Sequence, residues 1–433
     1  MSNVREPESN SNAPLDESMP RLQLTRLSNG LRVATVDDTW AKQSDVLVAV
    51  VRVLAGSALD ESLPGIARFT GTMLTRGSAG RNLEQIAEEL DALGASLGTG
   101  VGAEASDGSI KCLRDDGDMV LGYLADAMLR PDFPEDQIGI VRGQMRSALR
   151  QSRDSTRAEA ERLMREALFP PGHPFHDSAI GTDESLEAVD RDALEAYHSV
   201  AFRPENGIVA VAGGITHAGA VELVERHFGK WGGQPPQAVI PQPEPPAANV
   251  RLEGAIAGKS QADIAMAAPA IQRRHPDYYA LSVANLILGR FGLMGRLGDS
   301  VRERQGMAYY VYSSVEAGRS VGLWSANAGV DPSNVERAID SIIEVVREFQ
   351  ADGPTEREFS DAIGSITGSL PLSLETSGGI ANVVSDILYH ELGEDYLQRY
   401  RSLIDALTPD EIVRAARTHI TPDQLTISVV GPS

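Results

Sequence analysis

Two side chains that could act on a peptide bond lie seven positions apart in the sequence, Arg302 and Tyr309. A guanidinium group and a phenolic hydroxyl can both donate hydrogen bonds to a peptide carbonyl as it gains negative charge. Gly306 is a natural helix C-cap, so we expect Arg302 in the last turn of a helix, before a strand that carries Tyr309. The spacing alone fits better with a solvated helix residue at Arg302 and a tyrosine that fills the core at position 309.

A second pair of candidate residues, His173 and His176, lies in the sequence His-Pro-Phe-His. Two imidazoles can hold a metal ion, but Pro174 between them prevents the helical i, i+3 geometry. We therefore expect a structural loop over residues 172–182. The sequence has no Gly-x-Ser-x-Gly elbow and no glycine-rich phosphate loop ending in Lys, so it lacks the signatures of two other large enzyme classes.

Composition narrows the possible partners. The 433 residues carry 61 acidic and 39 basic side chains, a net charge of −22, which makes a nucleic-acid partner improbable. Cys112 is the one cysteine, so an internal disulfide and a cysteine-based metal cluster are excluded. No apolar run approaches the ~20 residues of a membrane span, and residues 1–20 have no hydrophobic signal core. We expect a cytoplasmic protein without a membrane partner, or a periplasmic one if an export signal has been removed.

The elements that would position these residues can be predicted from local patterns. The first half is predicted to contain a hairpin over 22–36 with an Asn-Gly turn, a strand over 44–54, helices from Gly65 and from Asn82, a strand over 97–113 and a long helical stretch over 134–168. Gly98, Gly100 and Gly102 alternate in the strand over 97–113. We expect another part of the chain to approach its backbone closely there.

The sequence is an internal duplication. Val189–Gly213 aligns without a gap with Leu407–Gly431, 218 positions later, and Pro134–Leu168 matches Pro354–Leu388. We expect an α+β fold of two homologous domains, each with a mostly antiparallel sheet and helices on one face. The predicted boundaries are a disordered lead-in (1–20), an N-terminal domain (21–231), a proline-rich linker (232–249) and a C-terminal domain (250–433).

The stretch Gly65–Ser78 reads Gly-Ile-Ala-Arg-Phe-Thr-Gly-Thr-Met-Leu-Thr-Arg-Gly-Ser. It resembles the zinc-binding helix of the M16 peptidases (pitrilysin, insulin-degrading enzyme and mitochondrial processing peptidase), which reads Gly-x-Ala-His-Phe-x-Glu-His-Met-Leu-x-x-Gly-Thr. The two His and the Glu of that inverted motif bind zinc and activate water. Here those positions are Arg68, Gly71 and Thr72, so the resemblance implies a degenerate motif. Restoring all three residues should not restore activity, and replacing a helical glycine should stabilise the helix.

Family members take a third zinc ligand, a Glu, from a downstream helix. The corresponding stretch, Gln137–Gln151, has no Asp or Glu. We therefore expect no metal or cofactor in this chain, and the resemblance implies zinc in a partner subunit.

The second half keeps the family pattern. Leu288–Ser314 resembles Leu-Gly-x-x-x-x-x-x-Arg-Leu-x-x-x-x-Arg-Glu-x-x-Gly-x-Ala-Tyr-x-Val-x-Ser, and the resemblance implies that Arg302 and Tyr309 are the catalytic pair that binds substrate opposite the zinc. Gly289, Gly292 and Gly295 also resemble the glycine-rich substrate loop of the processing peptidase's non-catalytic subunit.

Two hypotheses follow from this contrast. In the first, the chain is the non-metal, substrate-binding subunit of a heterodimeric M16 zinc peptidase. A partner subunit supplies His-x-x-Glu-His, and a peptide is the substrate. In the second, it is a non-catalytic binding or structural protein of the same fold, like the core subunits of respiratory complexes. An intact His-x-x-Glu-His in a neighbouring reading frame would favour the first.

Overall fold

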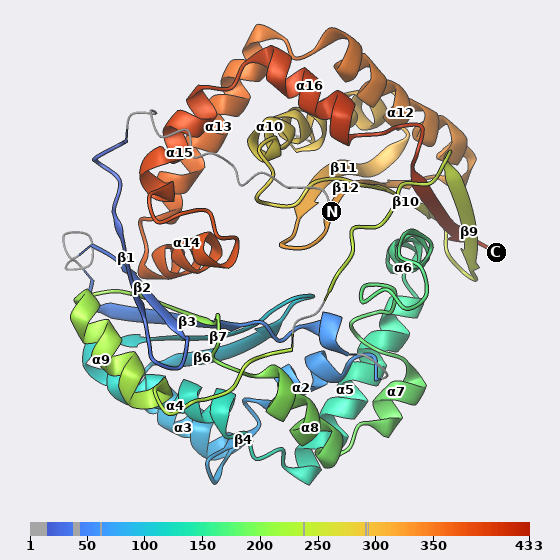
Figure 1. Ribbon diagram of the computed structural model, residues 1–433. Coiled ribbons are helices and arrows are strands. Elements are labelled where there is room, and N and C mark those ends of the chain that lie inside the picture. Colours follow the sequence, from blue (N-terminus) through green and yellow to red (C-terminus); the bar gives the residue numbers. More distant parts are fainter. Residues whose placement is uncertain (1–14, 38–43, 61–62, 237–238, 291, 293) are drawn as a thin grey trace.

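The computed structural model describes residues 15–433, except 38–43, 61–62, 237–238, 291 and 293 (Figure 1). Most of the predicted N-terminal lead-in therefore lies outside the described residues, and 15–20 carry neither helix nor strand. No described helix is long and apolar enough to cross a membrane.

The described residues form two large sheets, one in each half, and a small two-stranded sheet, β4-β5, in the first half. The elements of the first half are β1 (Leu22–Arg26), β2 (Arg32–Val36), β3 (Val46–Val53), η1 (Ser57–Leu59), α2 (Ile66–Met73), β4 (Gly77–Ser78), β5 (Arg81–Asn82), α3 (Leu83–Ala92), β6 (Ser96–Val101), β7 (Ser106–Leu113), η2 (Arg114–Asp116), α4 (Gly117–Leu129), α5 (Glu135–Arg153), α6 (Thr156–Leu168), α7 (Asp183–Ala188), α8 (Arg191–Ala201), β8 (Ile208–Ala212) and α9 (His217–Phe228). Those of the second half are β9 (Val250–Ile256), β10 (Ala262–Pro269), α10 (Tyr278–Gly289), α11 (Gly295–Leu297), η3 (Gly298–Arg304), β11 (Ala308–Ala317), β12 (Gly322–Val330), η4 (Pro332–Asn334), α12 (Val335–Asp352), α13 (Glu356–Ser373), α14 (Ser377–Tyr389), α15 (Tyr396–Asp405), α16 (Pro409–His419) and β13 (Thr426–Pro432).

The two sheets repeat one topology. The first has the strand order β1-β2-β8-β3-β7-β6 and the second, in the reverse direction, β9-β13-β10-β12-β11. In each, one parallel pair (β2 with β8, β9 with β13) adjoins antiparallel strands. The predicted α+β fold with two homologous, mostly antiparallel sheets is confirmed.

Local signals explain the ends of several elements. The predicted Asn-Gly hairpin joins β1 to β2, with Gly30 at a φ of +86°. Asn82 and Gln85 form the predicted capping box of α3. The predicted helical stretch over 134–168 is two helices, because Ser155 breaks α5 and caps α6 through its side chain.

One predicted strand is wrong. Residues 97–113 form a hairpin, β6 and β7, joined through Gly102–Ala105. The expected close approach is also absent at Gly100, where an added Cβ would have no heavy atom within 4 Å. The alternating glycines instead leave one face of the edge strand β6 open.

Both faces of each sheet are covered over the central strands, but by helices from different halves. Helices of the same half, including α4 and α9 in the first and α10, α12 and α16 in the second, cover one face. The opposite face of the first sheet packs against α14 from the second half, and α6 from the first half packs on the second sheet. Figure 1 shows these two exchanged helices at opposite ends of the space between the sheets. Residues 232–249 connect the halves without helix or strand wherever they are described.

Candidate functional site

Helix α2 contains Arg68, Gly71 and Thr72, and its start is fixed by the half-buried carboxylate of Asp60. Gly65 adopts a φ of +92°, and Asp60 accepts hydrogen bonds from the backbone N–H groups of Gly65 (2.7 Å) and Ala67 (3.0 Å). These bonds satisfy two N–H groups that a helix start leaves unpaired. Burial raises the pKa of Asp60 to about 7, because its desolvation outweighs these hydrogen bonds.

The three positions of the zinc motif do not form a metal site. Arg68 is exposed, and Thr72 donates its hydroxyl hydrogen bond to the Arg68 carbonyl (2.9 Å). Gly71 is buried, and a Cβ placed on it would lie 2.1 Å from Val101 Cγ2 on β6. Zinc finds no set of ligands here. Arg68 offers a guanidinium, the Thr72 hydroxyl is bonded to the backbone, and Gly71 has no side chain. The residues present therefore do not fit the metal that this helix holds in zinc peptidases.

Helix α5 includes the stretch that corresponds to the third zinc ligand of the family. Its side chains make structural contacts instead. Its apolar face packs against α2, with Ile138, Val141 and Met145 in the same cluster as Phe69. The guanidinium of Arg142 donates to two backbone carbonyls at the end of α7, those of Leu186 and Val189, and Arg146 pairs with acidic side chains of α7. This stretch contains no Asp or Glu, and its arginines link α5 to α7 through hydrogen bonds and ion pairs.

The predicted C-cap before Tyr309 is present. Gly306 has a φ of +63°, its N–H donates to the Arg302 carbonyl (3.0 Å), and Met307 N–H donates to the Val301 carbonyl (3.0 Å). The helix that ends there, η3, is π-helical. The Arg302 side chain is 36% exposed, and its Nε lies 3.7 Å from Glu303 Oε1.

Tyr309 is the extra residue of a β-bulge. Ala308 pairs with Val330 and Tyr310 with Gly329, so no residue of β12 lies opposite Tyr309. Bulges re-aim side chains, and the Tyr309 side chain is 68% exposed. Among the described residues its hydroxyl has no hydrogen-bond partner, and no hydrogen bond or cation–π contact joins it to Arg302.

The neighbouring tyrosines of β11 are engaged in packing between the halves. Tyr310 donates to Asp263 (2.5 Å), and the Tyr312 hydroxyl accepts from Arg157 of α6. The Arg157 guanidinium also lies over both rings. Of the three tyrosines on this strand, Tyr309 is therefore the one whose hydroxyl has no partner within the described structure.

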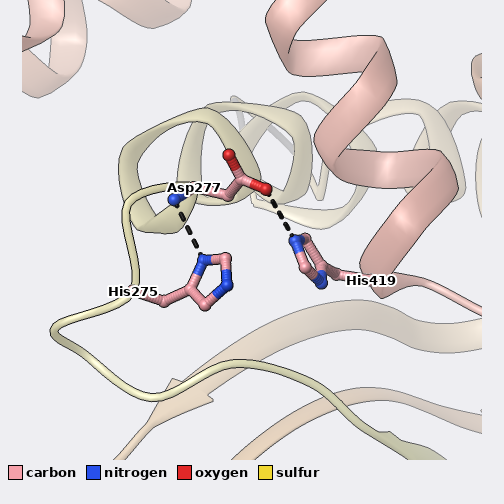
Figure 2. A group of neighbouring side chains, drawn as sticks. All are labelled: His275, Asp277 and His419. Carbon is pink, nitrogen blue, oxygen red and sulfur yellow. Dashed lines mark hydrogen bonds and ion pairs between the residues drawn. The ribbon is translucent and has the colours of Figure 1, made fainter. Parts of the chain in front are cut away.

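Within the described ranges, one cluster of His, Cys, Asp or Glu side chains has metal-ligand spacing: His275, Asp277 and His419, with ligand atoms within 4.8 Å of one another. Figure 2 shows the Asp277 carboxylate directed at His419, and the His275 ring accepting from the Asp277 backbone N–H. His419 Nε2 lies 2.8 Å from Asp277, and the Arg414 guanidinium binds both carboxylate oxygens (2.7 and 3.0 Å).

These bonds explain the cluster without a metal. The Arg414 and His419 hydrogen bonds lower the pKa of Asp277 to about 2, and burial lowers the pKa of His275. The carboxylate that a cation would need is already neutralised by Arg414, so the group fits best as a link between the start of α10 and the end of α16.

The pair His173 and His176 holds a loop together, as the proline between them predicts. His173 Nε2 lies 2.8 Å from the Pro241 carbonyl of the linker, and its Nδ1 accepts from Phe175 N–H (3.0 Å). His176 Nδ1 lies 2.7 Å from the Phe169 carbonyl.

Gly289, in the glycine-rich segment, is also needed for packing, because a Cβ there would lie 2.1 Å from Ser313 Oγ.

Two homologous halves, each with a mostly antiparallel sheet and its own helices, define the fold of this chain, and the residues of α2 do not fit zinc. The chain belongs to peptidase family M16. Residues 32–172 match the insulinase (peptidase family M16) domain, and residues 188–365 match the peptidase M16 inactive domain.

The relatives of this chain are described in different ways, some as peptidases and one as a non-peptidase. An uncharacterized zinc protease of Mycobacterium leprae is 30% identical over 82% of this chain and 79% of its own length. A probable mitochondrial-processing peptidase subunit beta of Schizosaccharomyces pombe is 24% identical, covering 96% and 92%. A non-peptidase homologue of Helicobacter pylori is also 24% identical, covering 87% and 86%. A solved structure, the peptidase M16 inactive domain from Pseudomonas fluorescens, superposes with a TM-score of 0.89 at 26% identity, covering 95% and 98%.

Proposed function

We propose that this chain is the non-metal, substrate-binding subunit of a two-chain M16 zinc peptidase. A second chain with an intact His-x-x-Glu-His motif supplies the metal and the catalytic carboxylate. Arg302 and Tyr309 of this chain donate hydrogen bonds to the peptide carbonyl that is attacked. Two findings support this proposal: residues 32–172 and 188–365 match M16 domains, and the residues of α2 do not fit zinc.

The exposure of Tyr309 is the observation that supports this proposal. Its hydroxyl has no hydrogen-bond partner in the described structure, and the residue is 68% exposed at a β-bulge. An aromatic side chain exposed to this extent can reach a substrate or a partner surface. A substrate or partner surface would supply what the fold itself does not.

The edges of both sheets support a peptide ligand. β6 ends the first sheet and β11 ends the second, so each has one side without a strand partner among the described elements. An extended peptide can add to such an edge through main-chain hydrogen bonds. Gly98 and Gly100 leave the open face of β6 without side chains, and Tyr309 lies on β11.

A non-catalytic binding protein is the second candidate, and α2 supports it. Gly71 is packed against Val101, and the arginines of α5 are bonded to α7. The residues at the position of the zinc site therefore make structural contacts. Such a chain would hold a peptide or a partner without contributing to its cleavage.

Steady-state kinetics of the reconstituted pair tests the choice. The purified chain is mixed with a chain carrying His-x-x-Glu-His, from a neighbouring reading frame, and peptide cleavage is assayed. Tyr309→Phe keeps the ring and removes one donor to the developing negative charge, so we expect kcat to fall on the order of 10²-fold with KM little changed. Arg302→Ala should lower kcat and raise KM, because a guanidinium also holds the bound substrate.

Two neighbouring substitutions are matched controls. Tyr312→Phe lies on the same strand and Arg304→Ala in the same turn, where Arg304 pairs with Asp299 (3.0 Å) and its side chain is 68% exposed. Both should assemble and cleave like wild type, with association followed by size-exclusion chromatography. If Tyr309→Phe and Arg302→Ala also assemble and cleave at wild-type rates, the chain is a scaffold and the second candidate takes the place of the first.

A further inference from the structure

The second half contains a cavity, open to solvent on one side, that the peptidase proposal does not use. It has a volume of about 610 Å³ and lies among α10, α13, α14 and α15. In Figure 1, α10, α13 and α15 lie together at the upper left, and α14 lies below them, beside the first sheet. Four of its lining residues are tyrosines, at positions 278, 279, 396 and 400, and aliphatic side chains such as Leu286, Ile366 and Leu370 fill much of the rest. A volume of this size suits a small ligand or the end of a peptide.

A single guanidinium, that of Arg273, lies among these rings. Its Cζ lies 3.8 Å from the centroid of Tyr278, and its Nη2 donates to the hydroxyls of Tyr396 (2.8 Å) and Tyr279 (3.2 Å). Stacking and two hydroxyl acceptors fix the position of the group. They do not neutralise its charge, because no carboxylate lies within ion-pair distance of Arg273 in the described part of the chain.

The missing carboxylate is notable in this protein. The sequence has 61 acidic residues against 39 basic ones, and many arginines outside this cavity, such as Arg52, Arg162 and Arg296, form ion pairs with Asp or Glu. A partly buried cation without a counter-ion is costly unless a ligand supplies the charge.

The cavity also offers hydrogen-bond donors that no protein group takes up. A guanidinium has five N–H donors, and the two hydrogen bonds of Arg273 use only its Nη2. Tyr279 donates to the Tyr396 oxygen (2.5 Å), so the Tyr396 hydrogen remains free for another acceptor. His390 lines the same cavity and has a buried Nδ1 without a partner.

The other charges of the lining favour an anion as well. Arg290 lines the cavity and is exposed, whereas Asp386, the acidic residue of the lining, pairs with Arg52 of the first half (2.7 Å). Two guanidinium groups therefore face one carboxylate that is already held elsewhere.

We propose that this cavity is a binding site for a carboxylate attached to an apolar body, with Arg273 and the Tyr396 hydroxyl as its donors. The planar fork of an arginine matches the two oxygens of a carboxylate. The tyrosine and aliphatic walls take up the apolar part. The same chemistry is found in a small organic acid and in the free C-terminus of a peptide that ends in an apolar residue. The site does not depend on a partner chain or on Arg302 and Tyr309.

The first experiment uses the wild-type chain alone and compares an acid with its amide. N-acetylphenylalanine and N-acetylphenylalaninamide differ only in the carboxylate, and isothermal titration calorimetry measures both at pH 7.5. We expect saturable binding of the acid, with a dissociation constant of about 1 mM or lower, and at least about tenfold weaker binding of the amide. The tripeptide acetyl-Ala-Ala-Phe, with a free or amidated C-terminus, distinguishes a peptide end from a small acid. Tighter binding of the free tripeptide than of N-acetylphenylalanine identifies the peptide end.

Two substitutions then locate the site. Arg273→Met keeps an apolar chain of similar length and should weaken acid binding at least about tenfold, and Tyr396→Phe should weaken it about three- to tenfold. Arg357→Met, on the outer surface of α13 with a 91% exposed side chain, should bind the acid like wild type. Melting temperatures without ligand check that each variant is folded.

Several results would overturn the proposal: no saturable binding of either acid, equal binding of acid and amide, or undiminished acid binding by folded Arg273→Met. Should Arg273→Met fail to fold, Tyr396→Phe and the acid–amide comparison on wild type still decide the question.

Discussion

The packing of Gly71 limits which side chains α2 can carry. An added Cβ would lie 2.1 Å from Val101 Cγ2, a contact that real Cβ atoms do not make. Val101 is β-branched and therefore stiff at χ1, so the strand or the helix has to shift. The expectation that replacing this glycine stabilises the helix considered propensity alone, and the structure contradicts it.

A single substitution tests this packing. Gly71→Ala should lower the free energy of unfolding by about 1 to 3 kcal/mol, because overpacking outweighs the gain of up to about 1 kcal/mol in helix propensity. Gly139→Ala in α5 is the matched control, since nothing lies within 4 Å of its added Cβ, and it should stabilise by about 0.5 to 1 kcal/mol. Urea unfolding measures both. Adding Val101→Ala should recover most of the loss at Gly71, and a loss that persists in the double variant would contradict the steric explanation.

The carboxylate of Asp60 predicts a pH dependence of stability. Its pKa of about 7 in the folded chain lies above the ordinary value of 3.8, because burial disfavours the charged form. Between these two values the folded state holds a proton that the unfolded state has lost. The contribution of Asp60 to stability is therefore present below about pH 4 and is lost as the pH rises through 7.

Wild type and Asp60→Asn should accordingly differ in how their stability changes with pH. From pH 5 to pH 8, wild type should lose on the order of 1 to 3 kcal/mol more unfolding free energy than the variant. Urea unfolding at pH 5, 6, 7 and 8 gives the two curves. Asp45→Asn, at a side chain that is 87% exposed, should run parallel to wild type. Parallel curves for Asp60→Asn as well would show that this carboxylate is charged throughout the range.

At the scale of elements, the exchanged helices carry much of the stability. Val384 and Leu388 of α14 belong to the same buried cluster as Val48 and Val50 of the first sheet. Arg32 donates to the Leu388 carbonyl (3.3 Å), and Arg52 pairs with Asp386 of the same helix (2.7 Å). On the other sheet, α6 buries Ala160 and Met164 beside β10 and β13.

Leu388→Ala should therefore destabilise the whole chain, although Leu388 belongs to the second half and packs on the first sheet. We expect a loss of about 2 to 4 kcal/mol in a single unfolding transition. Leu372→Ala, 66% exposed on α13, is the control and should change stability by less than about 0.5 kcal/mol. Circular dichroism and tyrosine fluorescence in the same urea series measure this. Two separated transitions in Leu388→Ala would mean that the sheets unfold independently.

These elements also show how far the sequence could be interpreted. The capping boxes and the Asn-Gly turn are local, and the repeat is visible because Val189–Gly213 and Leu407–Gly431 align without a gap. The hairpin over 97–113 was missed because Gly102–Ala105 has no Asn-Gly or Asp-Gly signal. The exchange of α6 and α14 depends on contacts between residues that are distant in the sequence, which periodicity cannot report.

Some features of the candidate sites could likewise be predicted from the sequence, and others could not. The losses at Arg68, Gly71 and Thr72 are evident from residue types alone, as is the C-cap at Gly306. The β-bulge that exposes Tyr309 follows from pairing with β12, which local patterns do not specify. The cavity around Arg273 gave no sequence signal, because Tyr396 lies 123 positions from Arg273 and meets it only after α15 packs beside α13.

At the scale of the whole molecule, the duplication does not make two independent domains. Each sheet owes one of its covered faces to a helix from the other half, and the bond from Ser428 Oγ to the Ala160 carbonyl (2.7 Å) is among those that cross between them. A half expressed alone would leave an apolar sheet face uncovered and would carry an exchanged helix with no surface to bury it. Exposed apolar surface of this extent favours unfolding and aggregation.

We therefore predict that residues 15–231 and 250–433, produced separately, do not fold as monomers. Each should show little cooperative thermal unfolding by circular dichroism and should aggregate, because no native helix covers the exposed face of its sheet. Refolding the two fragments together from urea should restore a 1:1 complex, since every helix then finds its sheet without the linker over 232–249. Ser428→Ala in the second fragment is a mild control. It removes one buried hydrogen bond to α6 and should weaken the complex about three- to tenfold without preventing it. A fragment that is monomeric and unfolds cooperatively on its own would show that the exchanged helices add contacts without being needed for folding.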